Sequence, residues 1–370
     1  MKQKVKLKDI ASYSKGSQIN GTELIENGEF DYLNGGINPS GKWNEANCNA
    51  DTIAISEGGN SCGYVNYMRK PFWCGAHCYY LYDTVANTKY LYYALKSQQE
   101  RIMKLRSGAC MPNIKKSDLG NFEFIFDDDD KQQKNTTDIL NKIERVIELR
   151  QKEIFYLDEL VKARFVEMFG TLHDNENGFD VVTIDDVCSL IKDGTHQTPQ
   201  YTEDKESGYK FLSSKDVMSQ KIDWSDIKYI PADLHEQLYK TLKPQRNDIL
   251  MSKNGVNYGV AAVNDTDEVF DIYVSLALLR PKEVINSIFF RCAINNQETK
   301  LQFNSSIKGI GVPNLHLGEI RKTKIFLPPI ELQNQFADFV QQVDKSKSAI
   351  KKSLEETQIL FDSLMQKYFG

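Results

Sequence analysis

The chain has 370 residues, of which 41% are hydrophobic and 26% charged, enough for two or three domains with substantial cores. No segment approaches the ~20 continuous apolar residues of a membrane-spanning helix, and the first ten residues lack the apolar core of a signal peptide. The net charge of −5 is not that of a generic nucleic-acid binder, so any DNA contact must come from local basic patches or be shared with a partner. Seven cysteines, an odd number, favour free thiols in a reducing compartment. We therefore expect a cytoplasmic protein.

Taken in order from the N-terminus, short strands alternate with polar turns, and the same series returns in the second half of the chain. The identities are sparse, but their order and spacing hold over the full length, which predicts two pseudo-symmetric copies. The clearest correspondences pair residues 5–11 with 182–188, 15–18 with 193–196, 31–37 with 210–216, 51–59 with 247–255, and 108–114 with 309–315.

Each copy ends in a long helical segment, residues 131–170 and 331–370. Apolar or aliphatic-stemmed residues recur there at alternating steps of three and four, the pattern of a helix that pairs with another helix. Neither segment has an internal Gly or Pro, and each predicts a helix of roughly 60 Å. The repeating positions are Ile139, Ile143, Val146, Arg150, Ile154, Leu157, Val161, Arg164 and Met168, and then Phe336, Val340, Val343, Lys347, Ile350, Leu354, Thr357, Phe361, Leu364 and Tyr368.

The predicted fold class is therefore α+β. Two mostly β globular domains, residues 1–130 and 171–330, are each followed by a long helix, residues 131–170 and 331–370, and the helices pair as a coiled coil. The ten positions we expect to form the helix seam, or to bind a partner, are Ile143, Ile154, Leu157, Val161, Val340, Val343, Ile350, Leu354, Phe361 and Leu364.

The sequence contains no clear catalytic motif. A dinucleotide-binding glycine motif, a phosphate-binding loop and a His-Glu-x-x-His motif are all missing, as is the Asn/Asp-Pro-Pro-Tyr/Phe motif of amino-methyltransferases. Cys74, His77 and Cys78 form the most metal-like cluster, but the second copy lacks matching cysteines, so we interpret it as a buried strand with free thiols rather than a zinc site. The acidic run 127–130 could hold a cation, but we expect it to cap the helix that follows. We expect no metal site and no catalytic residue.

Polar loops at equivalent places in both copies are better candidates for function. Each mixes Gly with Asn, Gln, Ser, Lys or Arg, which can reach phosphates and base edges. Taken singly, each is an ordinary turn; their recurrence indicates one DNA-contacting surface used twice. The candidate contacts are Lys15, Ser17, Gln18, Asn34, Asn60, Arg106 and Asn113 in the first copy, and Thr195, His196, Gln197, Ser213, Lys215, Lys253, Asn254, Tyr258, Lys308 and Asn314 in the second. Among these, Arg106, Lys253 and Lys308 are the strongest single candidates.

Across essentially its whole length, the chain resembles the specificity subunits of type I restriction-modification enzymes. The double arrangement of globular unit and long helix is the most specific part of this resemblance. The first copy departs from the pattern, because four aspartates (127–130) stand where the second copy has Leu327-Pro-Pro. The matching segments are 164–170, 194–199, 211–217, 247–252, 311–314 and 327–333.

The resemblance implies a DNA-reading scaffold that has no catalytic activity of its own. Each target-recognition domain would read one half of a gapped, asymmetric double-stranded target. The helices would lie antiparallel, set the gap, and dock two modification (methyltransferase) subunits, with restriction subunits joining through the complex. S-adenosylmethionine, ATP and Mg²⁺ would bind the partner subunits and not this chain. Two alternatives remain open from the residues alone: a coiled-coil scaffold that does not bind DNA, and an enzyme with an unrecognised site.

Overall fold

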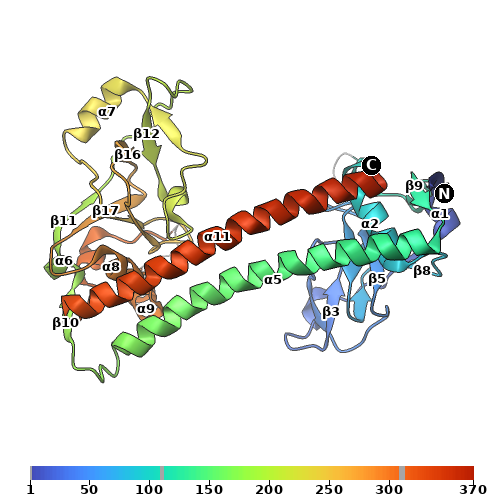
Figure 1. Ribbon diagram of the computed structural model, residues 1–370, viewed down its shortest axis with the longest axis horizontal. Coiled ribbons are helices and arrows are strands. Elements are labelled where there is room, and N and C mark those ends of the chain that lie inside the picture. The colour runs from blue at the N-terminus through green and yellow to red at the C-terminus, as the bar shows by residue number, and fades with distance from the viewer. Residues whose placement is uncertain (1, 109–111, 308–312) are drawn as a thin grey trace. The chain divides into compact units, whose positions relative to one another are not determined.

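The computed structural model describes residues 2–108, 112–307 and 313–370, and the chain divides into two compact units (Figure 1). Unit 1 comprises residues 1–152 and 351–370, and unit 2 comprises residues 153–350. Each unit thus holds a globular part together with portions of two long helices, α5 (Asp130–Phe169) and α11 (Ile330–Phe369). These helix bounds differ by one residue at each end from the predicted segments.

The globular part of unit 1 contains a four-stranded antiparallel sheet of order β2-β8-β5-β6, a three-stranded sheet of order β4-β3-β7, and the pair β1-β9. In the three-stranded sheet β3 and β7 run parallel. The strands are β1 (Lys2–Lys6), β2 (Ser12–Lys15), β3 (Phe30–Leu33), β4 (Gly41–Trp43), β5 (Thr52–Ser56), β6 (Val65–Met68), β7 (Phe72–Cys74), β8 (Cys78–Tyr82) and β9 (Glu123–Asp127), and the helices are α1 (Leu7–Ile10), η1 (Gly21–Glu23), α2 (Thr88–Ser97), α3 (Gln99–Met103) and α4 (Lys116–Gly120).

Unit 2 repeats this topology with sheets of order β11-β17-β14-β15, β13-β12-β16 and β10-β18. Here β12 and β16 are the parallel neighbours. The elements are β10 (Asp180–Thr183), α6 (Ile184–Val187), β11 (Cys188–Asp193), β12 (Tyr209–Leu212), η2 (Ser214–Val217), β13 (Lys228–Ile230), α7 (Ala232–Tyr239), β14 (Ile249–Ser252), β15 (Ala261–Val263), β16 (Phe270–Ile272), β17 (Leu276–Pro281), α8 (Ser287–Ile294), α9 (Gln297–Ser306), α10 (Leu317–Lys322) and β18 (Lys324–Leu327).

The central strands β5 and β14 are buried on both faces, so they show apolar runs instead of alternation. Ile53 and Ile55 belong to the main core of unit 1, whereas Ala54 packs with residues of β3 and β7 in a smaller core. In β14, Ile249 and Leu250 divide in the same way between two cores of unit 2. Because successive side chains of a strand point to opposite faces, each four-stranded sheet joins two apolar layers.

In its first turn, each long helix has a buried glutamine that ties it to its globular part. Gln133 accepts a hydrogen bond from the backbone N–H of Asn87 and donates to the carbonyl of Asp127. Gln333 repeats this in unit 2 with the N–H of Asn286 and the carbonyl of Pro328. These residues fix the start of each helix where the preceding strand ends.

The acidic run supplies the cap of α5, as predicted. A carboxylate oxygen of Asp129 accepts hydrogen bonds from the backbone N–H groups of Lys131 and Gln132, at 2.9 and 3.2 Å. Such a cap satisfies N–H groups that have no partner within the helix, and negative charge suits this end of the helix dipole.

Within each unit the two long helices run antiparallel. In unit 1 the guanidinium of Arg150 donates to the Ser353 carbonyl and the Thr357 hydroxyl. In unit 2 the rings of Phe165 and Phe336 lie 5.5 Å apart, and Lys347 forms an ion pair with Asp158. All ten residues predicted for the seam are buried or half-buried: Ile143, Ile154, Leu157, Val161, Val340, Val343, Ile350, Leu354, Phe361 and Leu364.

Two positions of the longer repeat in α5 were predicted wrongly. Ile139 and Val146 are 41% and 38% exposed, whereas Leu140 is fully buried and Ile147 half-buried. The buried face of α5 is therefore shifted by one residue here, because Leu140 packs in the main core of unit 1, which contains residues of the globular part as well as of α11.

The cysteine-rich segment lies in the smaller core of unit 1. Cys48, Cys74 and Cys78 are buried there, while the side chain of His77 is 63% exposed. Among the described residues, no three His, Cys, Asp or Glu side chains are grouped so that they could hold a metal ion.

Within the same described part of the chain, no helix is long and apolar enough to cross a membrane.

Candidate nucleic-acid interface

In unit 1 the predicted polar loops meet at the ends of strands β2, β5 and β8. Backbone hydrogen bonds join Ser17 N–H to the Cys74 carbonyl at 2.9 Å and Glu57 N–H to the His77 carbonyl at 2.9 Å. The segment around Asn113 joins this group, since Ile114 N–H donates to the Glu57 carbonyl at 2.9 Å. Loops that are far apart in the sequence therefore form one surface.

Unit 2 builds the equivalent surface with the same backbone connections. Thr195 N–H donates to the Ile272 carbonyl at 3.0 Å. Lys253 N–H donates to the Ser275 carbonyl at 2.9 Å, and Leu315 N–H donates to the Lys253 carbonyl at 2.9 Å. The correspondence between the two halves therefore extends to individual hydrogen bonds, although few side chains are shared.

Equivalent glycines make these close approaches possible. A Cβ on Gly16 would lie 1.9 Å from the Cys74 carbonyl oxygen, and one on Gly194 would lie 2.2 Å from the Ile272 carbonyl oxygen. In the next loop Gly59 and Gly255 have φ values of +73° and +83°. This left-handed conformation favours glycine, which explains why a glycine stands at these loop positions in both copies.

An ion pair crosses each surface, and its charges are exchanged between the units. In unit 1 the Nζ of Lys15, at the end of β2, lies 2.5 Å from a carboxylate oxygen of Glu57, just after β5. In unit 2 the first position is Asp193 and the second is Lys253, with 2.6 Å between their charged atoms. The pairing survives although the acid and the base have changed places.

This arrangement corrects one expectation. Lys253 was predicted to contact DNA, but its side chain is only 6% exposed and its ammonium is paired with Asp193. Burial and pairing leave no free cation for a phosphate, so Lys253 holds the loops together instead. Lys15, at 45% side-chain exposure, remains accessible.

The other candidates of unit 1 lie on the same surface or at its margin. The side-chain amide of Asn34 donates to Gln18 at 3.3 Å, and its oxygen accepts from the backbone N–H of His77 at 3.1 Å. Asn113 forms backbone bridges to Gly58 and Ser107. The candidates with exposed side chains are Lys15, Ser17, Gln18, Asn60, Arg106 and Asn113.

In unit 2 several candidates already have partners. The Ser213 side chain forms a capping box with Asp216 at the start of η2. Lys215 forms ion pairs with Asp216 at 2.8 Å and Asp226 at 3.2 Å. Ser213 therefore has a local structural role, while Lys215 remains partly exposed and balanced by two acids.

Tyr258 is also engaged. Its hydroxyl donates to Asn304 at 2.7 Å, and the ammonium of Lys300 lies 3.6 Å from its ring centroid. Burial lowers the pKa of Lys300. The Tyr258 ring thus forms part of a packed cation–π contact at the edge of the surface.

Two loops of unit 2 offer freer groups. Thr195 is half-buried, and His196 and Gln197 are exposed. Asn254 forms a backbone bridge to the exposed Asn314, and its side-chain oxygen is buried without a hydrogen-bond partner among the described residues. Lys308, the remaining candidate, lies outside the described residues.

Four residues of these surfaces were not predicted as part of the site. Glu57 and Asp193 carry the carboxylates of the two ion pairs, His77 lies beside Glu57, and Lys300 packs on Tyr258. The alignment of the two copies could have revealed the acids, because it places Lys15 opposite Asp193 and Glu57 opposite Lys253. Opposite charges exchanged at two positions are a sign of contact.

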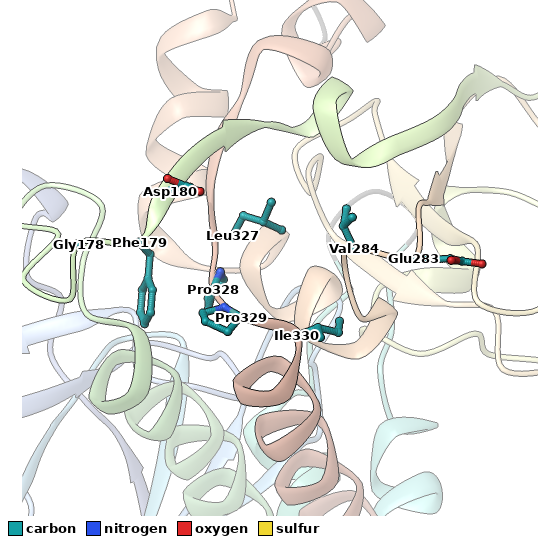
Figure 2. Close-up of a pocket in the computed structure, with 9 residues that line it drawn as sticks. All are labelled: Gly178, Phe179, Asp180, Glu283, Val284, Leu327, Pro328, Pro329 and Ile330. Atoms are coloured by element: carbon teal, nitrogen blue, oxygen red, sulfur yellow. The ribbon is translucent and has the colours of Figure 1, made fainter.

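A cleft lies at the start of α11 in unit 2 (Figure 2). It has a volume of about 610 Å³ and is lined mainly by apolar side chains and prolines, with Asp180 and Glu283 as its charged residues. Figure 2 shows Phe179, Leu327 and Pro328 beside one another along one side. None of the predicted contact residues lines this cleft.

The long helices expose apolar side chains in addition to their buried seam. In unit 1 these include Leu149 on α5 and Ile359 on α11. In unit 2 they include Phe155, Tyr156 and Leu160 on α5, with Phe155 57% and Tyr156 65% exposed. Large apolar side chains grouped on a surface are typical of protein interfaces.

Comparisons with known proteins agree with this architecture. A putative type I specificity subunit from Mycoplasma genitalium is 26% identical over 375 residues, covering 96% of this chain and 90% of the relative. Another from Mycoplasma pneumoniae is 41% identical over 116 residues, which cover 30% of this chain and 31% of the relative.

Solved structures show the same fold. The crystal structure of a type I restriction-modification system S subunit from M. genitalium matches with a TM-score of 0.65 and 22% identity, covering 100% of this chain and 96% of that one. A chain from a structural study of complex assembly and conformational transition in a type I system matches with a TM-score of 0.55 and 14% identity, covering 99% and 97%. The family model for the type I restriction modification DNA specificity domain matches residues 2–157 and 176–359. Since these two segments span most of its length, the chain belongs to the family of type I restriction-modification DNA specificity domains.

Proposed function

We propose that this chain is the subunit that selects the DNA target of a type I restriction-modification complex, with each unit reading one half of a bipartite target. The observation that carries the proposal is the duplicated loop surface. Equivalent backbone hydrogen bonds hold loops with different side chains in the two units, so one framework presents two different sets of groups to DNA.

The target is asymmetric, because the two surfaces differ where they are exposed. Unit 1 presents Lys15, Gln18 and Arg106, whereas unit 2 presents His196 and Gln197. Side chains of these kinds donate to or accept from base edges and phosphates. Two unlike readers on one chain select two unlike half-sites.

The paired helices set the gap between the half-sites. Both α5 and α11 contribute residues to both units, and a helix pair is stiffer than a flexible linker. Their exposed apolar residues, among them Phe155 and Tyr156, dock two modification subunits. Restriction subunits join through that complex.

The chemistry belongs to the partner subunits. S-adenosylmethionine, ATP and Mg²⁺ bind there, and this chain supplies target selection. Because its net charge is −5 and phosphate neutralisation supplies most non-specific affinity, the isolated chain binds DNA weakly and loses binding steeply as salt rises.

A selection from random DNA duplexes tests the proposal, using the chain co-purified with its modification subunit. Recovery of two short, unlike motifs at a fixed gap supports two readers on one helical spacer. Recovery of no motif contradicts DNA reading and favours a scaffold whose helices serve protein contacts alone.

A further inference from the structure

Each loop surface contains a histidine beside its ion pair. In unit 1 the Nδ1 of His77 lies 3.8 Å from the second carboxylate oxygen of Glu57, whose first oxygen pairs with Lys15. In unit 2 the Nε2 of His196 lies 3.6 Å from the second carboxylate oxygen of Asp193, whose first oxygen pairs with Lys253. Both surfaces therefore carry a lysine, a carboxylate and a histidine in contact.

The two units reach this arrangement from different sequence positions. The acid follows β5 in unit 1 but ends β11 in unit 2, and the lysine occupies the opposite place in each. His77 precedes β8, whereas His196 follows β11. Simple inheritance from a duplicated ancestor would keep residue types at equivalent positions. Here the lysine, the acid and the histidine come from non-equivalent positions in the two units. This indicates that the three side chains together have a function on each surface.

Core packing does not account for the histidines. Their side chains are 63% and 75% exposed, while the carboxylates beside them are 9% and 19% exposed. The lysine already neutralises each carboxylate at 2.5 or 2.6 Å. At 3.6–3.8 Å the imidazole is at ion-pair rather than hydrogen-bond distance from the carboxylate. It therefore does not supply a hydrogen bond that the carboxylate needs.

The backbone around His77 is nevertheless fixed. His77 N–H donates to Asn34, and its carbonyl accepts from Glu57 N–H. Gly35, with φ of +83°, allows that loop to approach, since a Cβ there would lie 2.6 Å from the His77 carbonyl oxygen. Unit 1 therefore holds an exposed imidazole on an ordered loop, with Nδ1 facing a carboxylate and Nε2 without a hydrogen-bond partner among the described residues.

We infer that His77 and His196 are base-reading residues, one in each recognition surface, each beside its carboxylate–lysine pair. This inference rests on the proposed function and names residues that carry it. The free ring nitrogen, Nε2 in His77 and Nδ1 in His196, donates to or accepts from a base edge in the groove. Equivalent trios in both units give each half-site one histidine contact.

The test uses the full chain co-purified with its modification subunit and a random-duplex pool as the probe. Selections are run with the unaltered protein, with His77→Ala, with His196→Ala and with His173→Ala. His173 is the matched control, because it is 91% exposed and lies 4.0 Å from the Asp174 carboxylate, but it lies between the end of α5 at Phe169 and the start of β10 at Asp180, and not on the loop surface. Thermal unfolding of each variant is measured alongside.

The expected result is a loss of discrimination, roughly tenfold, at one base pair of one half-site for His77→Ala and of the other half-site for His196→Ala. His173→Ala and the unfolding temperatures stay unchanged. Uniform weakening at all sequences, or a lower unfolding temperature as the sole effect, overturns base reading by these residues. If the unaltered complex selects two motifs that neither variant changes, the inference fails and the proposed function stands. If it selects none, both fail.

Discussion

The Nζ of Lys253 lies 2.6 Å from the Asp193 carboxylate, and the equivalent pair of unit 1, Lys15 with Glu57, has its charges exchanged. The lysine of the unit 2 pair is the more buried of the two, since the side chain of Lys253 is 6% exposed and that of Lys15 is 45% exposed. Water reaches the exposed ammonium of Lys15, weakens its attraction to Glu57 and takes its place when the side chain is removed, whereas both charged groups of the unit 2 pair are mostly shielded. The pair of unit 2 therefore contributes more to stability.

We therefore expect Lys253→Ala to lower the free energy of unfolding by roughly 3 kcal/mol and Lys15→Ala by about 1 kcal/mol. Urea unfolding of the full chain measures both. The double variant Asp193→Ala with Lys253→Ala should be more stable than Lys253→Ala alone, because it leaves no unpaired carboxylate. Equal losses for Lys253→Ala and Lys15→Ala would show that the burial of this pair has no energetic consequence.

The glutamine at the start of α11 gives a second stability prediction. Gln333 is fully buried and bonds to the N–H of Asn286 and the carbonyls of Val284 and Pro328. Gln333→Ala leaves these groups without partners and should cost about 2 kcal/mol. Gln335, two residues later and exposed, is the control, and its replacement by Ala should change stability by less than ~0.5 kcal/mol. Similar effects for the two variants would contradict a structural role for Gln333.

Much of this architecture was predictable because the chain carries it twice. The order of strands and turns, the two helices and their seam follow from local patterns that recur at matching positions. The helix face at Ile139 and Val146 was predicted wrongly, because the periodicity of a helix does not show where the globular domain packs against it in addition to the partner helix. The structural role of Gln333 could not be predicted, because its hydrogen bonds to distant backbone groups leave no pattern in the local sequence. The residue appeared only as part of the segment that resembles the family. Lys253 looked like a DNA contact because burial by folding cannot be read from one polar loop.

The thiols give a prediction about reactivity. Burial raises the pKa of Cys188 to about 12, so almost none of it is thiolate at pH 8, and its side chain is buried as well. Hydrogen bonding with Cys74 and burial raise the pKa of Cys48 too. Iodoacetamide at pH 8 should therefore leave both unmodified in the native chain and alkylate them after unfolding. Half-buried Cys292 should react earlier. Peptide mapping by mass spectrometry identifies the alkylated cysteines. Alkylation of Cys188 in the native chain as fast as in the unfolded chain would contradict its burial.

The exposed aromatics of α5 test where the modification subunit docks. Phe155 and Tyr156 are 57% and 65% exposed, so replacing both by Ser removes little from the folded chain, and its unfolding temperature should not fall. Aromatic side chains are frequent hot spots of interfaces, where truncation costs ~1–4 kcal/mol of binding. The double variant should therefore bind the modification subunit at least tenfold more weakly in a calorimetric titration. Glu153→Ala, on the same helix and also exposed, is the matched control and should bind normally. Normal binding by the aromatic variant would place the docking surface elsewhere on the helices.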